Sequence, residues 1–147
     1  MRWKPNVTVA AVIEVDERFL MIEEQTEAGV VINQPAGHLE KDESLLDAVK
    51  REVLEETAWE FEPESIVGIY LYPSSHNDIT YLRMCFTGTC LQHHPEQALD
   101  EGIIAAHWMT LEELNQRTEA LRSPLVSQCI EDYRAGKRYS LDILAQY

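Results

Sequence analysis

The chain has 147 residues, of which 45% are hydrophobic and 26% are charged, a length and apolar content suited to one folded domain spanning residues 1–147. Twelve Lys and Arg against 26 Asp and Glu give a net charge of -14. A surface this negative repels nucleic-acid backbones and anionic lipids, so we expect neither DNA nor a membrane as a stable partner. Anionic ligands remain compatible with the chain only where cations screen the charge.

Cysteine usage predicts a reducing compartment. The three cysteines, Cys85, Cys90 and Cys129, cannot all pair, and no CxxC spacing indicates zinc or a redox couple. We therefore expect reduced core thiols in a cytoplasmic protein. The apolar stretch Val7–Val15 is broken by polar residues, and no run approaches the ~18 apolar residues that span a bilayer.

The N-terminal part reads as strands. Two β-branched, apolar runs, Asn6–Val15 and Phe19–Ile22, flank a short polar turn and predict a hairpin. Val30–Ile32 predicts a third strand. Proline and glycine in Asn33–His38 predict a loop.

The periodicity then becomes helical. Apolar residues recur at helical spacing from Leu45 to Val53, which predicts a helix from Asp42 to about Thr57. Either Asp42 or Ser44 is suited to be its N-cap.

The rest of the chain mixes strands and short helices. The expected strands are Ser65–Tyr72, Ile79–Thr89 and Ala105–Met109, with a loop at Leu91–Gly102. A short helix capped by Thr110 follows, and then a helix over Pro124–Ala135 capped by Ser123. This order predicts an α+β fold around one core.

Acidic side chains continue the apolar face of the first helix. At about 100° per residue, Leu45 and Val49 define the core-facing direction, and Glu52 and Glu56 lie within about 80° of it. Glu55 lies at the border of that face. Burying isolated carboxylates costs several kcal/mol, and neighbouring like charges repel. A positive group must therefore compensate these acids.

Two interpretations of these acids compete. Arg51 is a nearby cation, but one guanidinium does not neutralise three carboxylates, whereas a hard divalent ion such as Mg²⁺ is usually held by a few carboxylates with open positions for water and phosphate. An ion would also bridge an acidic protein to an anionic substrate. The alternative is a solvated acidic face, which is common at helix ends.

The loop before the helix favours the metal interpretation. The segments GHLEKDE (37–43) and REVLEETAW (51–59) resemble the Nudix box, in which glycine, glutamate and an arginine-glutamate cluster recur at fixed spacing. The matching positions are Gly37, Glu43, Arg51, Glu52, Glu55 and Glu56. Ala58 departs from the family's glycine, and Trp59 from its aliphatic residue. A left-handed backbone at position 58 would cost alanine about 1 kcal/mol.

Further segments resemble the NudJ-type subgroup of Nudix hydrolases over nearly the whole chain. They are KPNVTVAA (4–11), NQPAGHLE (33–40) and LRSPL (121–125). The resemblance implies an α/β/α sandwich with a mixed sheet and hydrolysis of phosphoanhydride bonds by water, assisted by Mg²⁺ or Mn²⁺.

The resemblance also implies roles for the box residues. Glu52, Glu55 and Glu56 would bind the metal, with the carbonyl of Gly37 as an additional ligand. Arg51 and Glu43 would orient them, and Gly37 and Glu43 would shape the box. Catalysis would involve Glu52, Glu55 and Arg51.

The general base stays open at this point. Glu52 and Glu55 are candidates within the box. Asp100 and Glu101, in the loop before Trp108, are candidates outside it, against the alternative that they are solvated loop acids.

Substrate contacts rest on weaker signals. Arg83 alternates with apolar strand residues and would either meet phosphate or lie exposed on the strand. Arg122 precedes Ser123-Pro124 and would place a cation beside a helix N-terminus or serve the surface. Tyr81, like Trp3 and Tyr72, would stack on a base or pack in the core; we interpret His38 as a loop hydrogen-bonding residue and His93–His94 as loop surface.

The resemblance implies Mg²⁺-dependent hydrolysis of nucleoside di- or triphosphates or related small pyrophosphates, including the hydroxymethylpyrimidine pyrophosphate precursor of thiamine. A Nudix pyrophosphatase acting on ADP-ribose or dinucleotide polyphosphates is the nearest alternative. A metal-dependent nucleotide-binding module without turnover and a structural domain with an acidic helix are the others. Either a monomer or a small homo-oligomer fits the sequence.

Overall fold

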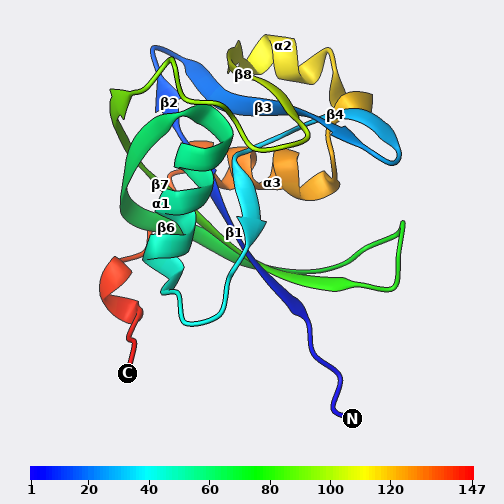
Figure 1. The fold of residues 1–147 in the computed structure, drawn as a ribbon, viewed down its shortest axis with the longest axis vertical. Coiled ribbons are helices and arrows are strands. Elements are labelled where there is room, and N and C mark those ends of the chain that lie inside the picture. The colour runs from blue at the N-terminus through cyan, green and yellow to red at the C-terminus, as the bar shows by residue number, and fades with distance from the viewer.

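The computed structural model describes residues 1–147. Its strands form two sheets, which together make the central layer of the fold (Figure 1). The strands are β1 (Asn6–Val12), β2 (Glu14–Val15), β3 (Arg18–Thr26), β4 (Gly29–Asn33), β5 (Ala36–His38), β6 (Trp59–Pro73), β7 (Thr80–His93) and β8 (Ile103–Thr110). The helices are α1 (Leu45–Thr57), α2 (Leu111–Asn115) and α3 (Pro124–Arg134), with the 3-10 turns η1 (Thr118–Ala120) and η2 (Leu141–Ile143).

The first sheet is mixed. Its strand order is β5-β1-β7-β6, and β1 runs parallel to β7, whereas its other neighbouring pairs are antiparallel. The second sheet is antiparallel: β2 pairs with the start of β3, β4 pairs with its end, and β8 pairs with β3 along residues 18–24. The α+β class and the mixed sheet predicted from the sequence are confirmed.

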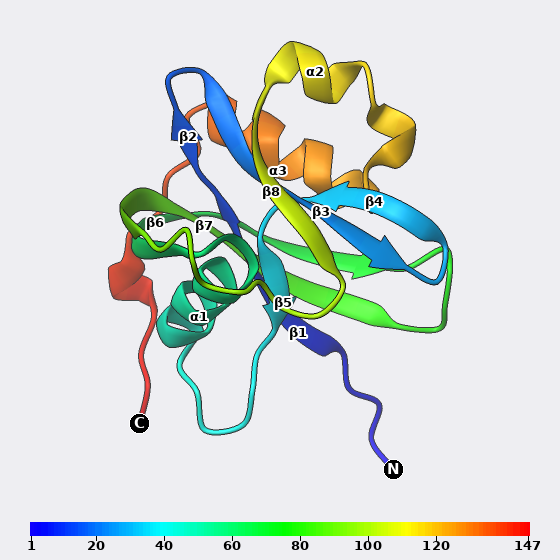
Figure 2. The same cartoon turned by 45° about the horizontal axis from the view of Figure 1, so that its top comes forward.

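Helices cover both sides of this layer. Alternate residues of β1 point in opposite directions, so Val9 and Ala11 pack with Val49 of α1, while Ala10 packs with Val126 of α3. β3 divides its side chains between the same two cores. Figure 2 shows α1 and α3 on opposite sides of the strands, the α/β/α arrangement that the resemblance implies.

The predicted N-terminal hairpin is wrong in its extent. The apolar run 6–15 does not pair with 19–22 as one unit, because the chain changes sheets at Ile13. Only β2 forms the hairpin with β3, through Asp16 and Glu17, which both have positive φ. β1 is apolar on both faces because helices cover both, as is typical of a central strand.

Other boundaries also differ from the prediction. Residues 36–38 of the expected loop form β5, which pairs with β1, so the loop is shorter than its Pro and Gly content suggested. β6 begins directly after α1, and β7 continues to His93, which shortens the expected loop 91–102. β-Bulges between Trp59 and Gly68 interrupt the alternation that would have shown the longer β6.

The helix ends follow the predicted capping. Ser44, rather than Asp42, caps α1, because its side chain accepts the N–H of Asp47 while Asp42 has φ +65°. Thr110 forms the expected capping box with Glu113, and Ser123 caps α3. Ala58 has φ +62°, so the α1 helix ends in a left-handed residue as expected.

The three cysteines are free thiols, and Cys85 and Cys129 are buried as predicted, whereas Cys90 is only half-buried. Every helix is too short or too polar to cross a bilayer.

Candidate active site

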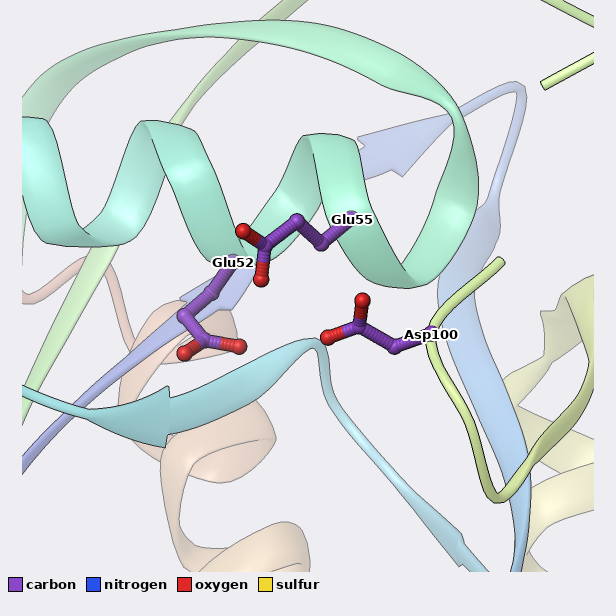
Figure 3. Close-up of side chains that lie close together, drawn as sticks. All are labelled: Glu52, Glu55 and Asp100. Atoms are coloured by element: carbon purple, nitrogen blue, oxygen red, sulfur yellow. The ribbon is translucent and has the colours of Figure 1, made fainter. Parts of the chain in front are cut away.

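Three carboxylates meet beside the C-terminal half of α1. Glu52 and Glu55 extend from the helix toward Asp100, which lies in the connection between β7 and β8 (Figure 3). One oxygen of each carboxylate lies within 4.8 Å of the others. Glu101, the neighbouring base candidate, is exposed and lies outside this group. The helical spacing of three residues brings Glu52 and Glu55 together, and the loop adds the third acid.

Glu52 is held beneath the strand β5. Its relative exposure is 8%, and burial raises the pKa of its carboxyl above the ordinary value despite the nearby Arg51. A β-carbon added to Gly37 would overlap the Glu52 carboxyl group. Only glycine therefore leaves room for this carboxylate against the strand, which accounts for the glycine that begins the box.

Glu56 lies one turn further along α1. Its exposure is 7%, and its Oε1 accepts the backbone N–H of Ala36 at 2.8 Å. Burial raises the pKa of this carboxyl to about 9, and the charges of Glu52, Glu24 and Asp100 act in the same direction. Glu56 does not join the compact group of Glu52, Glu55 and Asp100. Its position is thus adjacent to that group, and its role as a ligand stays a prediction.

Arg51 connects the box loop to the acids. Its Nε and Nη2 donate to the two oxygens of Glu43 at 2.6 and 3.0 Å, a bidentate pair, and Nη2 also donates to the carbonyl of His38. Nη1 donates to Glu52 at 2.8 Å and to Glu55 at 3.3 Å. This guanidinium lowers the pKa of Glu43, whereas the pKa values of Glu52 and Glu55 are still raised. One cation therefore does not compensate the whole cluster.

The donor set fits a hard divalent cation. Only carboxylate oxygens converge, no sulfur or imidazole takes part, and desolvation has left the acids with unbalanced negative charge. Oxygen ligands of this kind suit Mg²⁺ or Mn²⁺ rather than zinc.

Arg83, in β7, is buried on the side of the first sheet that faces α3. Its exposure is 7%, so the alternative of an exposed strand arginine is wrong. Its Nη1 donates to Oε1 of Gln34 at 3.0 Å, and Nη2 lies 3.5 Å from Oδ1 of Asn33. Nη1 also lies 3.9 Å from Sγ of Cys129 in α3, and the pKa of that thiol is lowered to about 7, first by its contact with Cys85 and further by Arg83. No carboxylate pairs with this buried guanidinium, which suits an anionic ligand.

The amide residues beside Arg83 were not identified from the sequence as functional. Gln34 is almost fully buried, and its Nε2 donates to the carbonyl of Val126 in α3. The available sequence signal for a functional role was the pair of amide residues, Asn33 and Gln34, between the expected strand Val30–Ile32 and Pro35.

The other candidate residues lie nearer the surface. Arg122 is exposed and forms an ion pair with Glu24, while Ser123 caps α3. Tyr81 is half-buried, with its ring centroid 6.3 Å from that of His38. His38 is hydrogen-bonded to Asn6 as expected, but it lies at the end of β5 rather than in a loop.

The histidines at the end of β7 are not free loop surface. His93 stacks on Trp59 with centroids 4.6 Å apart, and His94 lies 2.6 Å from a carboxylate oxygen of Glu60. Trp59 accounts for the position of His93, because its ring offers a flat face for stacking that an aliphatic residue lacks. Trp3 is exposed and Tyr72 is half-buried.

Comparison with known proteins assigns the chain to a family. A model of the NUDIX domain matches residues 3–129. The chain belongs to the Nudix family, and it is a hydrolase acting on phosphoanhydride bonds.

Individual relatives support this assignment. Phosphatase NudJ of Escherichia coli (strain K12) is 37% identical over 145 residues, which cover 99% of this chain and 94% of that protein. A NUDIX hydrolase from Nitrosomonas europaea is 51% identical, with a TM-score of 0.96 and 98% of both chains covered. The NUDIX domain of Shewanella oneidensis NrtR, solved with ADP ribose, shares the fold at a TM-score of 0.76 and 20% identity, with 92% of this chain and 90% of that one covered.

Proposed function

We propose that this hydrolase uses Mg²⁺, with Mn²⁺ as a substitute, to cleave nucleoside di- and triphosphates or related small pyrophosphates such as hydroxymethylpyrimidine pyrophosphate. The observation that carries the proposal is the convergence of Glu52, Glu55 and Asp100 within 4.8 Å. The substrate class is supported by the 37% identity to Phosphatase NudJ over nearly the full chain.

The metal site would use the box acids. Glu52 and Glu55 would hold the ion together with Asp100, and Glu56 and the carbonyl of Gly37 are proposed as further ligands. When bound, the ion neutralises phosphate oxygens and lowers the pKa of water. Burial raises the pKa values of Glu52, Glu55 and Glu56, so their charged forms are disfavoured without a nearby cation. A bound divalent ion would supply that positive charge, which supports the proposal.

The protein's own residues would orient the reaction. Glu55 is the least buried of the three helix acids, with a side-chain exposure of 38%, so it can reach the attacking water, and we assign it the role of general base. Arg51 contacts both Glu52 and Glu55 and would fix the direction of their oxygens. Its second contact, with Glu43, keeps the guanidinium in place while these oxygens act.

Substrate binding would use the cations outside the box. We propose that Arg83 pairs with an anionic group of the substrate, because its present acceptors are two amides and the Cys129 sulfur, with no carboxylate among them. Tyr81 offers a half-buried ring for stacking. Arg122 would contribute only by leaving its ion pair with Glu24.

The test is phosphate and pyrophosphate release across a panel of nucleotides and small pyrophosphates, with Mg²⁺, with Mn²⁺ and with chelator. We expect E52Q to lower kcat/KM by at least about 100-fold, since it removes a charged ligand from the metal site. E131Q, at an exposed position of α3, is the matched control and should keep full activity. Activity that persists with chelator or in E52Q would refute the metal assignment.

The same panel separates the alternatives. Release of AMP from ADP-ribose, or of two nucleotides from dinucleotide polyphosphates, would indicate the other pyrophosphatase specificities. Metal-dependent nucleotide binding without any product would indicate a binding module.

We also propose a cytoplasmic location and a monomer or small homo-oligomer. The three free cysteines support a reducing compartment. Light scattering of the purified chain measures the assembly state directly.

A further inference from the structure

The connection between β7 and β8 is attached to the last turn of α1. The N–H groups of His94 and Asp100 donate to the carbonyls of Ala58 and Glu55 at 2.8 and 3.0 Å. The side-chain Nε2 of Gln97 donates to the carbonyl of Leu54 at 2.9 Å. The final carbonyls of a helix lack helical donors, and Asp100 supplies one to the carbonyl of Glu55. The carbonyl of Leu54 also accepts the N–H of Ala58, so Gln97 is its second donor.

Gln97 occupies the middle of this attachment. Of the three bonds from the loop to the helix end, only that of Gln97 uses a side chain. Its backbone N–H also donates to the carbonyl of His94 at 2.9 Å, which closes a turn before the chain reaches Asp100. After Asp100, the carbonyl of Gly102 accepts the N–H of Gln25 in β3, so both sides of the acid are anchored.

The attachment works against electrostatic repulsion. Asp100 is exposed, and its carboxylate lies within 4.8 Å of those of Glu52 and Glu55, so the like charges repel in the absence of a cation. An exposed loop without anchors would relieve that repulsion by moving Asp100 into solvent. Figure 3 shows Asp100 held instead toward Glu52 and Glu55.

We propose that Gln97 is a positioning residue for hydrolysis. The hydrogen bond from its side-chain amide to the carbonyl of Leu54, near the end of α1, holds Asp100 beside Glu52 and Glu55. The proposal rests on the proposed function, because it assigns Asp100 to the metal site. Gln97 itself does not contact the acids, so it acts through the loop conformation.

The experiment measures Mn²⁺ binding by electron paramagnetic resonance in the full chain, together with kcat and KM. Gln97→Met keeps the length of the side chain and removes the donor. We expect it to weaken Mn²⁺ binding and lower kcat by about two- to tenfold, the effect of one lost hydrogen bond, with little change in KM. Gln92→Met, at an exposed position near the end of β7, is the matched control and should change neither value. Thermal unfolding of both variants verifies the fold.

A double-mutant cycle with D100N tests how Gln97 acts. If Gln97 works through Asp100, Gln97→Met should have no further effect on Mn²⁺ affinity in the D100N chain. Unchanged affinity in the single variant, or the same loss in both backgrounds, would overturn the proposal. Mn²⁺ binding is measured without turnover, so a wild-type chain that binds Mn²⁺ but releases no phosphate would instead contradict the proposed function.

Discussion

The two ends of α1 differ in how well their acidic side chains are paired with positive groups. At the N-terminal end, the side chain of Ser44 caps the helix and the carboxylate of Glu43 is paired with both nitrogens that Arg51 directs toward it. At the C-terminal end, Glu52 and Glu56 are buried and no basic residue lies in the last turn. Glu43 thus has a bidentate cation partner, whereas Glu52 and Glu55 share the one remaining nitrogen of Arg51 and Glu56 has no cation partner.

The helix dipole increases this contrast. Carboxylates are favourable near a helix N-terminus and unfavourable near its C-terminus, where the partial charge is already negative. The acids of α1 are concentrated at the unfavourable end. Sequences that break a local rule of this kind usually do so for function, and here the missing favourable term is a cation. The N-terminal end therefore contributes stability, and the C-terminal end gives up stability in favour of the metal site that we propose.

Neutralising the C-terminal end should produce the largest change in stability. The pKa of Glu56 is raised to about 9, so the folded metal-free protein binds a proton more tightly than the unfolded chain. The stability contributed by this group is complete below about pH 4.5 and is lost as the pH rises through 9. Metal-free wild-type protein should therefore become less stable between pH 5 and 9.

Glu56→Gln should remove this decline. At pH 8, we expect the free energy of unfolding of the metal-free variant to exceed that of the wild type by on the order of 3 kcal/mol. Urea unfolding at several pH values, with chelator, measures the difference. Added Mg²⁺ should stabilise the wild type more than the variant. A variant that is less stable than the wild type at pH 8 would show that the two ends do not differ as described.

Neutralising the acid at the N-terminal end should change the free energy of unfolding in the opposite direction and by a smaller amount. Glu43→Gln removes one charge from a half-buried bidentate pair, so we expect it to lower the free energy of unfolding by about 1–3 kcal/mol. The pKa of Glu43 is lowered, so this stabilisation is present above about pH 4.5 and is lost as the pH falls. Glu40→Gln is the matched control, because Glu40 is exposed and 3.6 Å from Arg51, where an ion pair contributes little. Equal losses in the two variants would contradict the role of the bidentate pair.

The part of the site that lies within one helix was predictable from the sequence. The spacing of Leu45, Val49, Glu52 and Glu56 follows from helical geometry alone. Local hydrogen bonding predicts the cap of α3 at Ser123, and it narrows the cap of α1 to Asp42 or Ser44, of which the structure uses Ser44. These features depend on residues within a few positions of each other.

The part that depends on distant pairing was not predictable. Asp100 and Glu101 are adjacent in sequence, and only the loop conformation decides that Asp100 meets the helix. Likewise, Arg83 is buried because Gln34, 49 positions away, reaches it from another strand. The change of sheet at Ile13 belongs to the same class, since an apolar strand does not reveal which neighbour it pairs with.

The residue that ends α1 provides the smallest test of the comparison. Ala58 has φ +62° and is almost fully buried, so it combines a backbone cost with a favourable methyl contact. Ala58→Gly removes the cost of about 1 kcal/mol for a left-handed alanine and loses a methyl contact worth slightly less. We expect the free energy of unfolding to stay the same or rise by less than about 1 kcal/mol, with metal-dependent activity intact. Ala58→Val, which adds a branched side chain in the same conformation, should instead lower the free energy of unfolding by at least about 1 kcal/mol. A large loss of activity or stability in Ala58→Gly would mean that the methyl group, rather than the acids and their loop, sets the geometry of this end of the helix.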